Sequence, residues 1–574
     1  MENKKKIINH FLEKDFLISE NLLNKIISTN IDYESFDKKE NNIILNEDIY
    51  SHFEDNNING IDWKEFEKFK VLDEKGKNKE IYKKFLDMLE QEEKEGIEKK
   101  IEDIEKGETK RVDELESNSN KYKKEEGNVE IVFSYDEKSK KRTVLDFVNY
   151  FRSRFKQMEP MFKSRLNNNP IISINKIKIK SQNDKISLIG IVSNISLTKN
   201  GHIIIELEDL TGKIKILFTN RSENNENYEK AKEVVLDEMI AIEGTIGQNN
   251  EIIFGDNILF AELSLIKELK KSPKEEYVVF IGDPHIGADM FLAEEFENMI
   301  KWLNGDLSDN KKIKSSNDEL INLNKEEEEK IISKIKYLII TGDIVDGVGI
   351  YPAQESDLFI KDIKKQYDVF AELLKKVPSH IKIIINAGNH DAMRIAEPQP
   401  IIYKEYAEKL CEMTNVIMIS NPGVVNIGKT TEFEGFNCLL YHGYSFTYYA
   451  DVIEDIRSKG GLTRADLIMQ ILLKKRHLAP SHGSTLYIPD SEKDNLVIEQ
   501  APDFFVTGHI HRLTSISNYK GISLLNCSTW MGETAFQEKV GLKPQIAKLP
   551  VANLKTREIL IFDFEKDKED VENE

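Results

Sequence analysis

Cysteine and long hydrophobic runs are both scarce in this chain of 574 residues. Its only cysteines are Cys411, Cys438 and Cys527. Three scattered thiols cannot form a disulfide framework or a Cys-x-x-Cys zinc site, so we expect a protein of a reducing, cytoplasmic compartment. No apolar run approaches the ~18–20 residues that a membrane-spanning helix needs. The basic start of the chain is soon interrupted by Glu13, Lys14 and Asp15, which argues against a signal peptide, and we expect no membrane partner.

The chain also lacks an overall positive charge, since 81 Lys and Arg residues against 101 Asp and Glu residues leave a net charge of −20. Phosphate binding needs local positive charge, so this balance alone argues against a nucleic-acid partner. Whole-chain charge says little about one face, however. A local basic run comprises Lys138, Lys140, Lys141, Arg142, Arg152, Arg154, Lys156, Lys163 and Arg165. Nucleic acid therefore stays among the candidate partners, and a solvated helix face is the alternative interpretation of the run.

The total length of the chain predicts three or four domains. The composition of its first part changes twice. Apolar residues at helical spacing predict a small helical, partner-binding domain over residues 1–89. Residues 90–140 are rich in Glu, Lys, Asp, Ser and Asn, which predicts a charged flexible linker. Residues 141–170 predict a basic amphipathic helix. Its apolar face would comprise Val144, Phe147, Val148, Phe151 and Phe155.

Residues 171–270 contain five short β-rich segments separated by turn signals. These segments are Ile186–Ile195, His202–Glu208, Lys213–Phe218, Met239–Thr245 and Glu251–Phe254. A helix-compatible stretch, Asn227–Glu233, lies between the third and the fourth, and this order is typical of an OB-type β-barrel. A generic β-sandwich is the alternative. An OB barrel binds single strands or docks proteins, and this one has no evident row of aromatic residues for base stacking.

Residues 275–567 alternate strands with helical segments, which predicts an α/β domain with helices covering a central sheet. A low-complexity insertion at 304–330 predicts a mobile loop. Five apolar runs in this domain end in residues of metal-binding type. The endings hold Asp283 and His285, then Asp343, then Asn389, His390 and Asp391, then His442, and finally His509 and His511. Because ligands gather at the carboxyl ends of parallel strands, we expect these side chains to converge on one crevice.

The set of strand-end residues predicts a site for two metal ions. Five of the chain's eleven histidines belong to it, and its oxygen and imidazole groups suit Mn²⁺, Fe²⁺ or Zn²⁺ better than Mg²⁺ alone. Eight such groups exceed the needs of one ion. Two ions about 3.5–4 Å apart clamp a phosphate ester and lower the pKa of a bound water. A carboxylate must then be shared between them, and Asp343 is the natural candidate.

In their order and identity these motifs resemble the calcineurin-like metallophosphoesterase superfamily. They are Gly-Asp-x-His (282–285), Gly-Asp-x-Val-Asp-Gly (342–347), Gly-Asn-His-Asp (388–391), His-Gly (442–443) and Gly-His-x-His (508–511). The resemblance implies a multidomain α/β protein built on the sheet sandwich of that superfamily. It implies that one ion is held by Asp283, His285, Asp343 and His511, and the other by Asp343, Asn389, His442 and His509. His390 would be a catalytic non-ligand that assists the leaving group, with Asp391 orienting it.

A narrower resemblance, over residues 140–565, is to the small subunit of the archaeal D-family DNA polymerase. It is carried by Gly349–Glu355, Gly388–Arg394, Lys475–Pro480, Val144–Arg165 and the preceding barrel. The resemblance implies a large catalytic polymerase subunit as partner and a 3′→5′ exonuclease that proofreads DNA 3′ ends, most often with Mn²⁺. The N-terminal helical domain would meet other replication factors. Arg394, just after the third motif, is a candidate DNA contact, and an exposed arginine without that role is the alternative.

Two other functions remain as alternatives to a proofreading exonuclease. One is a non-catalytic scaffold that stabilises the large polymerase subunit, against which the filled ligand positions argue. The other is a stand-alone metallophosphoesterase for small substrates or phosphoproteins. The barrel and the basic helix argue against this last function, because a small-substrate enzyme has little use for them.

Overall fold

The computed structural model describes most of the chain after residue 126. The described ranges are 127–136, 141–166, 169–220, 226–263, 268–307, 311–513, 516–534 and 543–566, with Gln537 and the parallel strands β1 (Leu17–Ile18) and β2 (Ile44–Leu45). Apart from β1 and β2, the predicted helical domain over 1–89 lies outside the described residues, as does most of the predicted linker. Within these ranges, no helix has the length and the apolar character needed to cross a membrane.

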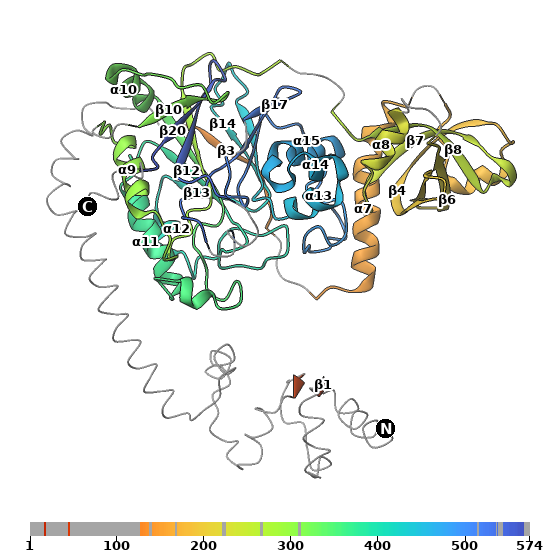
Figure 1. Cartoon of the computed structure of the whole chain (residues 1–574), viewed down its shortest axis with the longest axis horizontal. Helices are drawn as coiled ribbons and strands as arrows, with labels where there is room; N and C mark the ends of the chain where they lie inside the picture. Colours follow the sequence, from red (N-terminus) through yellow and green to blue (C-terminus); the bar gives the residue numbers. More distant parts are fainter. Residues whose placement is uncertain are drawn as a thin grey trace, which may run out of the picture. The chain divides into compact units, whose positions relative to one another are not determined.

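A closed five-stranded barrel occupies the region in which the OB-type barrel is predicted (Figure 1). Around the barrel its strands are β4 (Lys185–Leu197), β5 (Ile203–Asp209), β6 (Gly212–Phe218), β8 (Ile252–Phe260) and β7 (Met239–Ile246). Short helices accompany them: η4 (Ile174–Ile179), α8 (Glu226–Lys232) and η5 (Gln248–Asn250). Alternate apolar residues such as Ile205, Ile216 and Ile242 fill the interior. Closure pairs every strand on both sides, which excludes the β-sandwich alternative.

Two β-sheets and the helices that cover them form the second domain, so the predicted sheet sandwich is confirmed. The first sheet runs β10 (Lys312–Ser315), β20 (Ile559–Asp563), β19 (Lys548–Asn553), β9 (Tyr277–Ile281), β11 (Ile335–Thr341), β12 (Lys382–Asn386) and β13 (Val416–Met418). The second runs β17 (Ser517–Tyr519), β18 (Ile522–Asn526), β16 (Phe504–Thr507), β15 (Phe436–Leu440), β14 (Gly423–Ile427) and β3 (Val129–Ser134).

The strands of the first sheet are buried on both faces. Phe280 and Ile339 pack against the second sheet, whereas Ile281 and Ile340 pack against helices. The helices on the first sheet are α9 (Ala293–Leu303), α10 (Lys325–Ser333), α11 (Ile363–Lys375) and α12 (Glu408–Glu412). The second sheet carries α13 (Phe446–Val452), α14 (Glu454–Ser458) and α15 (Ala465–Lys475), and η6 (Gln354–Asp357) and η7 (Gly461–Arg464) lie in loops. Double burial explains the continuous apolar runs of these strands.

Two strands lie in segments that are predicted from the sequence to be flexible. β3 falls within the predicted linker 90–140, yet it pairs antiparallel with β14 as an edge strand, so the barrel is an insertion between β3 and β9. β10 falls within the predicted insertion 304–330 and pairs with β20. In the same insertion α10 begins after Asn324, whose side chain accepts a hydrogen bond from the Glu327 amide. The flexible interpretation is wrong for these residues because their partners are remote in the sequence.

Helix α7 (Val144–Lys163) confirms the helix predicted within 141–170, but not its apolar face. Val144 is 82% exposed, and Phe147 and Val148 are also exposed. Phe155 is buried as predicted, and the other buried residues are Tyr150, Ser153, Arg154, Met158 and Phe162. The Nε of Arg154 donates to Asp494 of the second domain at 2.6 Å, and its Nη1 donates to the carbonyl oxygen of Asp237 beside the barrel. Arg154 therefore joins the two domains and is not available to a nucleic acid.

Candidate metal centre

The predicted ligands stand on the turns that follow five strands. β9, β11 and β12 are parallel neighbours in the first sheet, and β15 and β16 are parallel neighbours in the second. Asp283 and His285 follow β9, Asp343 follows β11, Asn389 and His390 follow β12, His442 follows β15, and His509 and His511 follow β16. The carboxyl ends of these strands thus bring together residues that are separated by more than 200 positions in the sequence.

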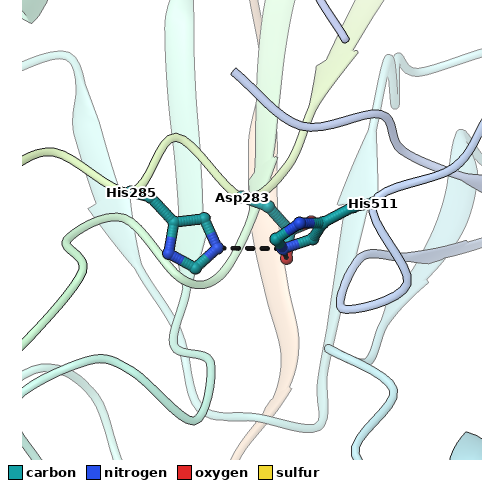
Figure 2. Close-up of side chains that lie close together, drawn as sticks. All are labelled: Asp283, His285 and His511. Atoms are coloured by element: carbon teal, nitrogen blue, oxygen red, sulfur yellow. Dashed lines mark hydrogen bonds and ion pairs between the residues drawn. The ribbon is translucent and has the colours of Figure 1, made fainter. Parts of the chain in front are cut away.

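Among the described residues, three groups of side chains are close enough to hold an ion, with ligand atoms within 4.8 Å of one another. They are Asp283, His285 and His511; His285, Asp343 and His390; and Asp343, His442 and His509. Figure 2 shows that His285 and His511 turn a ring nitrogen toward each other next to Asp283, and these two Nε2 atoms are 3.0 Å apart. The Nε2 of His442 lies 3.0 Å from the Asn389 Oδ1. Every predicted ligand is therefore in the cluster, and the membership of Asp343 in two groups fits its predicted shared role.

Two of the imidazole rings are oriented by acceptors on their outer side. The Nδ1 of His285 donates to Asp346 Oδ1 at 2.9 Å, and the Nδ1 of His442 donates to the carbonyl oxygen of Thr341 at 2.9 Å. The acceptors hold the proton on Nδ1. The Nε2 of a neutral ring then presents its lone pair to the centre of the cluster, as metal binding requires. The Gln537 amide nitrogen lies 2.7 Å from the Nδ1 of His511.

Five of the seven predicted ligands have a left-handed backbone conformation. Their φ angles lie between 47° and 72°, and the residues are Asp283, His285, Asp343, His509 and His511. Residues other than glycine rarely adopt this region, and clusters of them occur at active sites. The glycines beside them permit close approach. A Cβ on Gly388 would lie 2.2 Å from an Asp343 carboxylate oxygen, so only glycine fits there.

Buried charges of both signs set the electrostatics of the cluster. Burial raises the pKa of Asp283 well above its usual value. Burial also acts on Asp343, but the imidazoles of His442 and His390 hold the pKa of that carboxyl well below its usual value. For His442, burial lowers the pKa, but Asp343 outweighs it and raises the pKa to about 10. Burial and the charge on His442 lower the pKa of His509 to about 3. The buried carboxylates of this set need positive charge beside them, and its oxygen and imidazole ligands are of the types that bind divalent cations.

The orienting partner of His390 is Asp346 rather than Asp391. The Nδ1 of His390 donates to the carbonyl oxygen of Asp346 at 2.8 Å, and an Asp346 carboxylate oxygen lies 3.5 Å away. The Asp391 carboxylate accepts instead from the Gly388 amide at 2.8 Å and from the Tyr367 hydroxyl at 3.0 Å. The role predicted for Asp391 is therefore wrong, because that side chain fixes the backbone of the turn. Asp346 is visible in the second motif, three residues after Asp343, but the spacing alone does not show which imidazoles it contacts.

Arg394 has partners within the protein. Its Nη2 donates to the carbonyl oxygen of Pro398 at 2.7 Å, and its guanidinium lies 5.3 Å from the centre of the Tyr135 ring. The side chain is half-buried. These contacts favour the alternative in which Arg394 has no DNA-binding role. A DNA contact by Arg394 stays a prediction.

Comparison with known proteins finds a matching family for each of the two domains. The family of calcineurin-like phosphoesterases matches residues 277–513, and the OB-fold nucleic acid binding domain matches residues 186–266. The DNA polymerase II small subunit of Methanothermobacter thermautotrophicus is 36% identical over 73% of this chain and 79% of its own length. That of Halobacterium salinarum is 32% identical over 73% of this chain and 75% of its own length.

A third relative, from Methanocaldococcus jannaschii, is 37% identical over 72% of this chain, but the match spans only 64% of that protein. It too is named a DNA polymerase II small subunit. The resemblance to polymerase small subunits seen in the sequence is therefore confirmed. The chain belongs to the family of DNA polymerase II small subunits, with one calcineurin-like phosphoesterase domain and one OB-fold domain.

Proposed function

We propose that the chain is a metal-dependent 3′→5′ DNA exonuclease that proofreads within a replicative DNA polymerase. The observation that supports this is the convergence of seven ligand-type residues and His390 from five strand ends, in a chain whose relatives are polymerase small subunits. Its partner would be the large catalytic subunit. Its substrate would be the last phosphodiester bond at a DNA 3′ end.

Two divalent cations fit the cluster. Asp283, His285, Asp343 and His511 would hold one, and Asp343, Asn389, His442 and His509 would hold the other. When bound, the cations would neutralise phosphate charge and supply a hydroxide nucleophile at neutral pH. We expect Mn²⁺, while Fe²⁺ and Zn²⁺ suit the same mixed donor set. Mg²⁺ is a weaker candidate because it prefers oxygen ligands.

His390 would protonate the leaving oxygen. Its Nδ1 proton is held by the carbonyl oxygen of Asp346, so the proton that it transfers would be on Nε2. Burial lowers the pKa of His390, but Asp343 and Asp346 outweigh that effect and raise it to about 9. Without bound metal, the ring therefore carries both protons at neutral pH. As the bond from phosphorus to the 3′-oxygen breaks, His390 would give its Nε2 proton to that oxygen and release a nucleoside 5′-monophosphate.

A second function of the chain, the stabilisation of the large subunit, is favoured by the exposed apolar residues of α7 and β3. Val144 and Leu145 are 82% and 61% exposed, and Ile131 and Val132 of β3 are 49% and 46% exposed. β3 is also an edge strand, and extended segments of partners pair with such edges. The scaffold function thus accompanies the nuclease function rather than replacing it.

The nuclease function is tested with the full-length chain and Mn²⁺, alone and in complex with the co-expressed large subunit. The substrates are 5′-labelled DNA strands with matched or mismatched 3′ ends, and the products are sized on denaturing gels. We expect stepwise shortening from the 3′ end. His390→Ala should abolish it while two ions per chain remain bound, and His482→Ala, at an exposed histidine outside the cluster, should not. Failure to release nucleotides in either setting would leave only the scaffold function.

A further inference from the structure

Two tyrosine rings lie beside different parts of the metal cluster. The ring centre of Tyr351 is 6.4 Å from that of His390, and the ring centre of Tyr444 is 5.7 Å from that of His509. His390 and His509 belong to different groups of the cluster. The two tyrosines come from separate loops, one after β11 and the other after β15. Both side chains are half-buried, so each keeps part of its surface open to a ligand.

Two other tyrosines near the cluster have a different environment. Tyr367 and Tyr441 are 1% and 0% exposed, and their hydroxyls donate to Asp391 and Glu397. They are core residues that brace the turns of the site. Tyr351 and Tyr444 are therefore the aromatic side chains at the cluster that offer free surface, among the tyrosines that the structure describes there.

The loop of Tyr351 is tied to the metal centre. The Tyr351 hydroxyl donates to Asp357 at 3.1 Å. Gln354, three residues after Tyr351, accepts from the Ile350 amide at 2.8 Å and donates to the Asp346 carboxylate at 2.7 Å. The backbone before the ring is thus tied through Gln354 to the same aspartate that orients His285 and His390, and the hydroxyl of the ring is held by Asp357. A ring that is fixed before a ligand arrives loses little entropy on binding.

The backbone at Tyr444 is fixed in a similar way. Gly443 has a φ of +115°, and its carbonyl oxygen accepts a hydrogen bond from the amide of Phe446, which is fully buried. Tyr444 therefore lies in a tight turn between the buried His442 and the first turn of α13. The turn places its ring next to His509 without enclosing it.

We infer that Tyr351 and Tyr444 form a stacking site for nucleobases, on which the bases on either side of the scissile phosphate rest. This inference rests on the proposed nuclease function. Arg394, the candidate DNA contact, is held by Pro398, so a DNA strand needs another source of affinity at the site. Stacking supplies it for every base, because each base has an aromatic face. Such tolerance suits an enzyme that removes any mispaired nucleotide.

The test compares two single-stranded DNA substrates that differ only at the last two nucleotides, which either both carry bases or are both abasic. The ratio of kcat/KM for the two substrates is measured on the Mn²⁺-loaded full-length chain. Each stacked base should raise this ratio by about 5- to 150-fold in the wild type. Tyr351→Leu or Tyr444→Leu should bring it toward one, while Tyr351→Phe and Tyr444→Phe keep it. Tyr403→Leu, at an exposed tyrosine elsewhere in the domain, is the matched control.

Equal losses on both substrates in the leucine variants, with an unchanged ratio, would overturn the inference, since the rings would then only support the histidines. If neither substrate is cleaved, the nuclease proposal fails, and stacking is tested by the fluorescence anisotropy of the same labelled strands. Tighter binding of the base-bearing strand by the wild type, lost in the leucine variants, would still support the stacking site. Equal binding of both strands by the wild type would refute it.

Discussion

We expect Asp346→Asn to weaken metal binding and nuclease activity about 10- to 100-fold, although Asp346 is not a predicted ligand. The carboxylate is 2% exposed and accepts from the Nδ1 of His285 at 2.9 Å and from Gln354 at 2.7 Å. Burial raises its pKa, but hydrogen bonds from His285 and His390 hold the pKa of Asp346 well below its usual value. The group is therefore a buried anion that fixes the proton of His285 on Nδ1.

Asparagine cannot reproduce these contacts in either orientation. With its oxygen toward His285, its amide nitrogen faces the Nε2 of Gln354, which is also a donor. With its nitrogen toward His285, the proton of that ring is driven to Nε2, the atom that faces the metal centre. Gln354 cannot turn its amide without losing the hydrogen bond to Ile350. The first arrangement leaves a buried donor without an acceptor, which costs about 1–3 kcal/mol. The second takes away the Nε2 lone pair that His285 would offer to a metal ion.

The matched control is Asp391→Asn. Its oxygen can still accept from the Gly388 amide, and its nitrogen can donate to the Tyr367 hydroxyl, so the loss should not exceed about one hydrogen bond. Both variants are compared with the wild type by isothermal titration with Mn²⁺, by nucleotide release, and by circular dichroism to check the fold. If Asp346→Asn binds Mn²⁺ and cleaves DNA like the wild type while Asp391→Asn does neither, the structural assignment is wrong.

Three further changes test the site and its support. Asp343→Ala should lose both ions because it removes the shared ligand, and two ions per chain by elemental analysis would contradict this. Arg154→Met should lower the free energy of unfolding by about 3–5 kcal/mol, because it breaks a buried ion pair and leaves Asp494 with only the neutral Tyr150 hydroxyl and His477 as side-chain partners; Arg152→Met, at an exposed position on the same helix, should not change it in urea titrations. Burial raises the pKa of Glu397 from 4.5 to about 7, so the folded chain retains a proton that the unfolded chain releases. The contribution of Glu397 to stability should therefore fall as the pH rises from 4.5 to 7. The total fall should be smaller in unfolding curves of Glu397→Gln, in which Asp391, with a pKa raised to about 6, still contributes a fall of the same sign.

Much of the site could be predicted from the sequence because each motif is local. A buried strand and the ligand at its end lie within a few residues, as with Tyr337–Thr341 and Asp343, so one apolar run predicts both. The convergence of the runs follows from the parallel order of β9, β11 and β12. The barrel was predictable for a similar reason, since three of its five strand pairings join consecutive strands, and only the pairings of β6 with β8 and of β4 with β7 do not.

The rest depends on contacts between remote residues. β3 pairs with β14, which lies almost 300 residues later, and its six residues, Val-Glu-Ile-Val-Phe-Ser, directly follow the charged stretch with which the prediction grouped them. The buried face of α7 is set by Asp494 and the barrel, so Arg154 is inside and Val144 is outside, against the pattern of apolar residues. The hydrogen-bond partner of His390 likewise depends on which turn of the fold lies next to its ring. Asp391 is adjacent in sequence, but the imidazole contacts Asp346.

The backbone at the ligands distinguishes a metal-binding subunit from a scaffold in physical terms. Each left-handed residue other than glycine costs about 1–3 kcal/mol, and five ligands carry this strain. Strain at a strand end is not needed by the sheet itself, whose backbone hydrogen bonds continue into the turns, as from the Asp283 amide to the Gly342 carbonyl oxygen. The strain does aim side chains from β9, β11 and β16 at one point, where buried carboxylates lie close to one another and imidazoles do the same. Cations at that point would relieve the repulsion between Asp283 and Asp343, and we expect this gain to offset the cost of the strained turns.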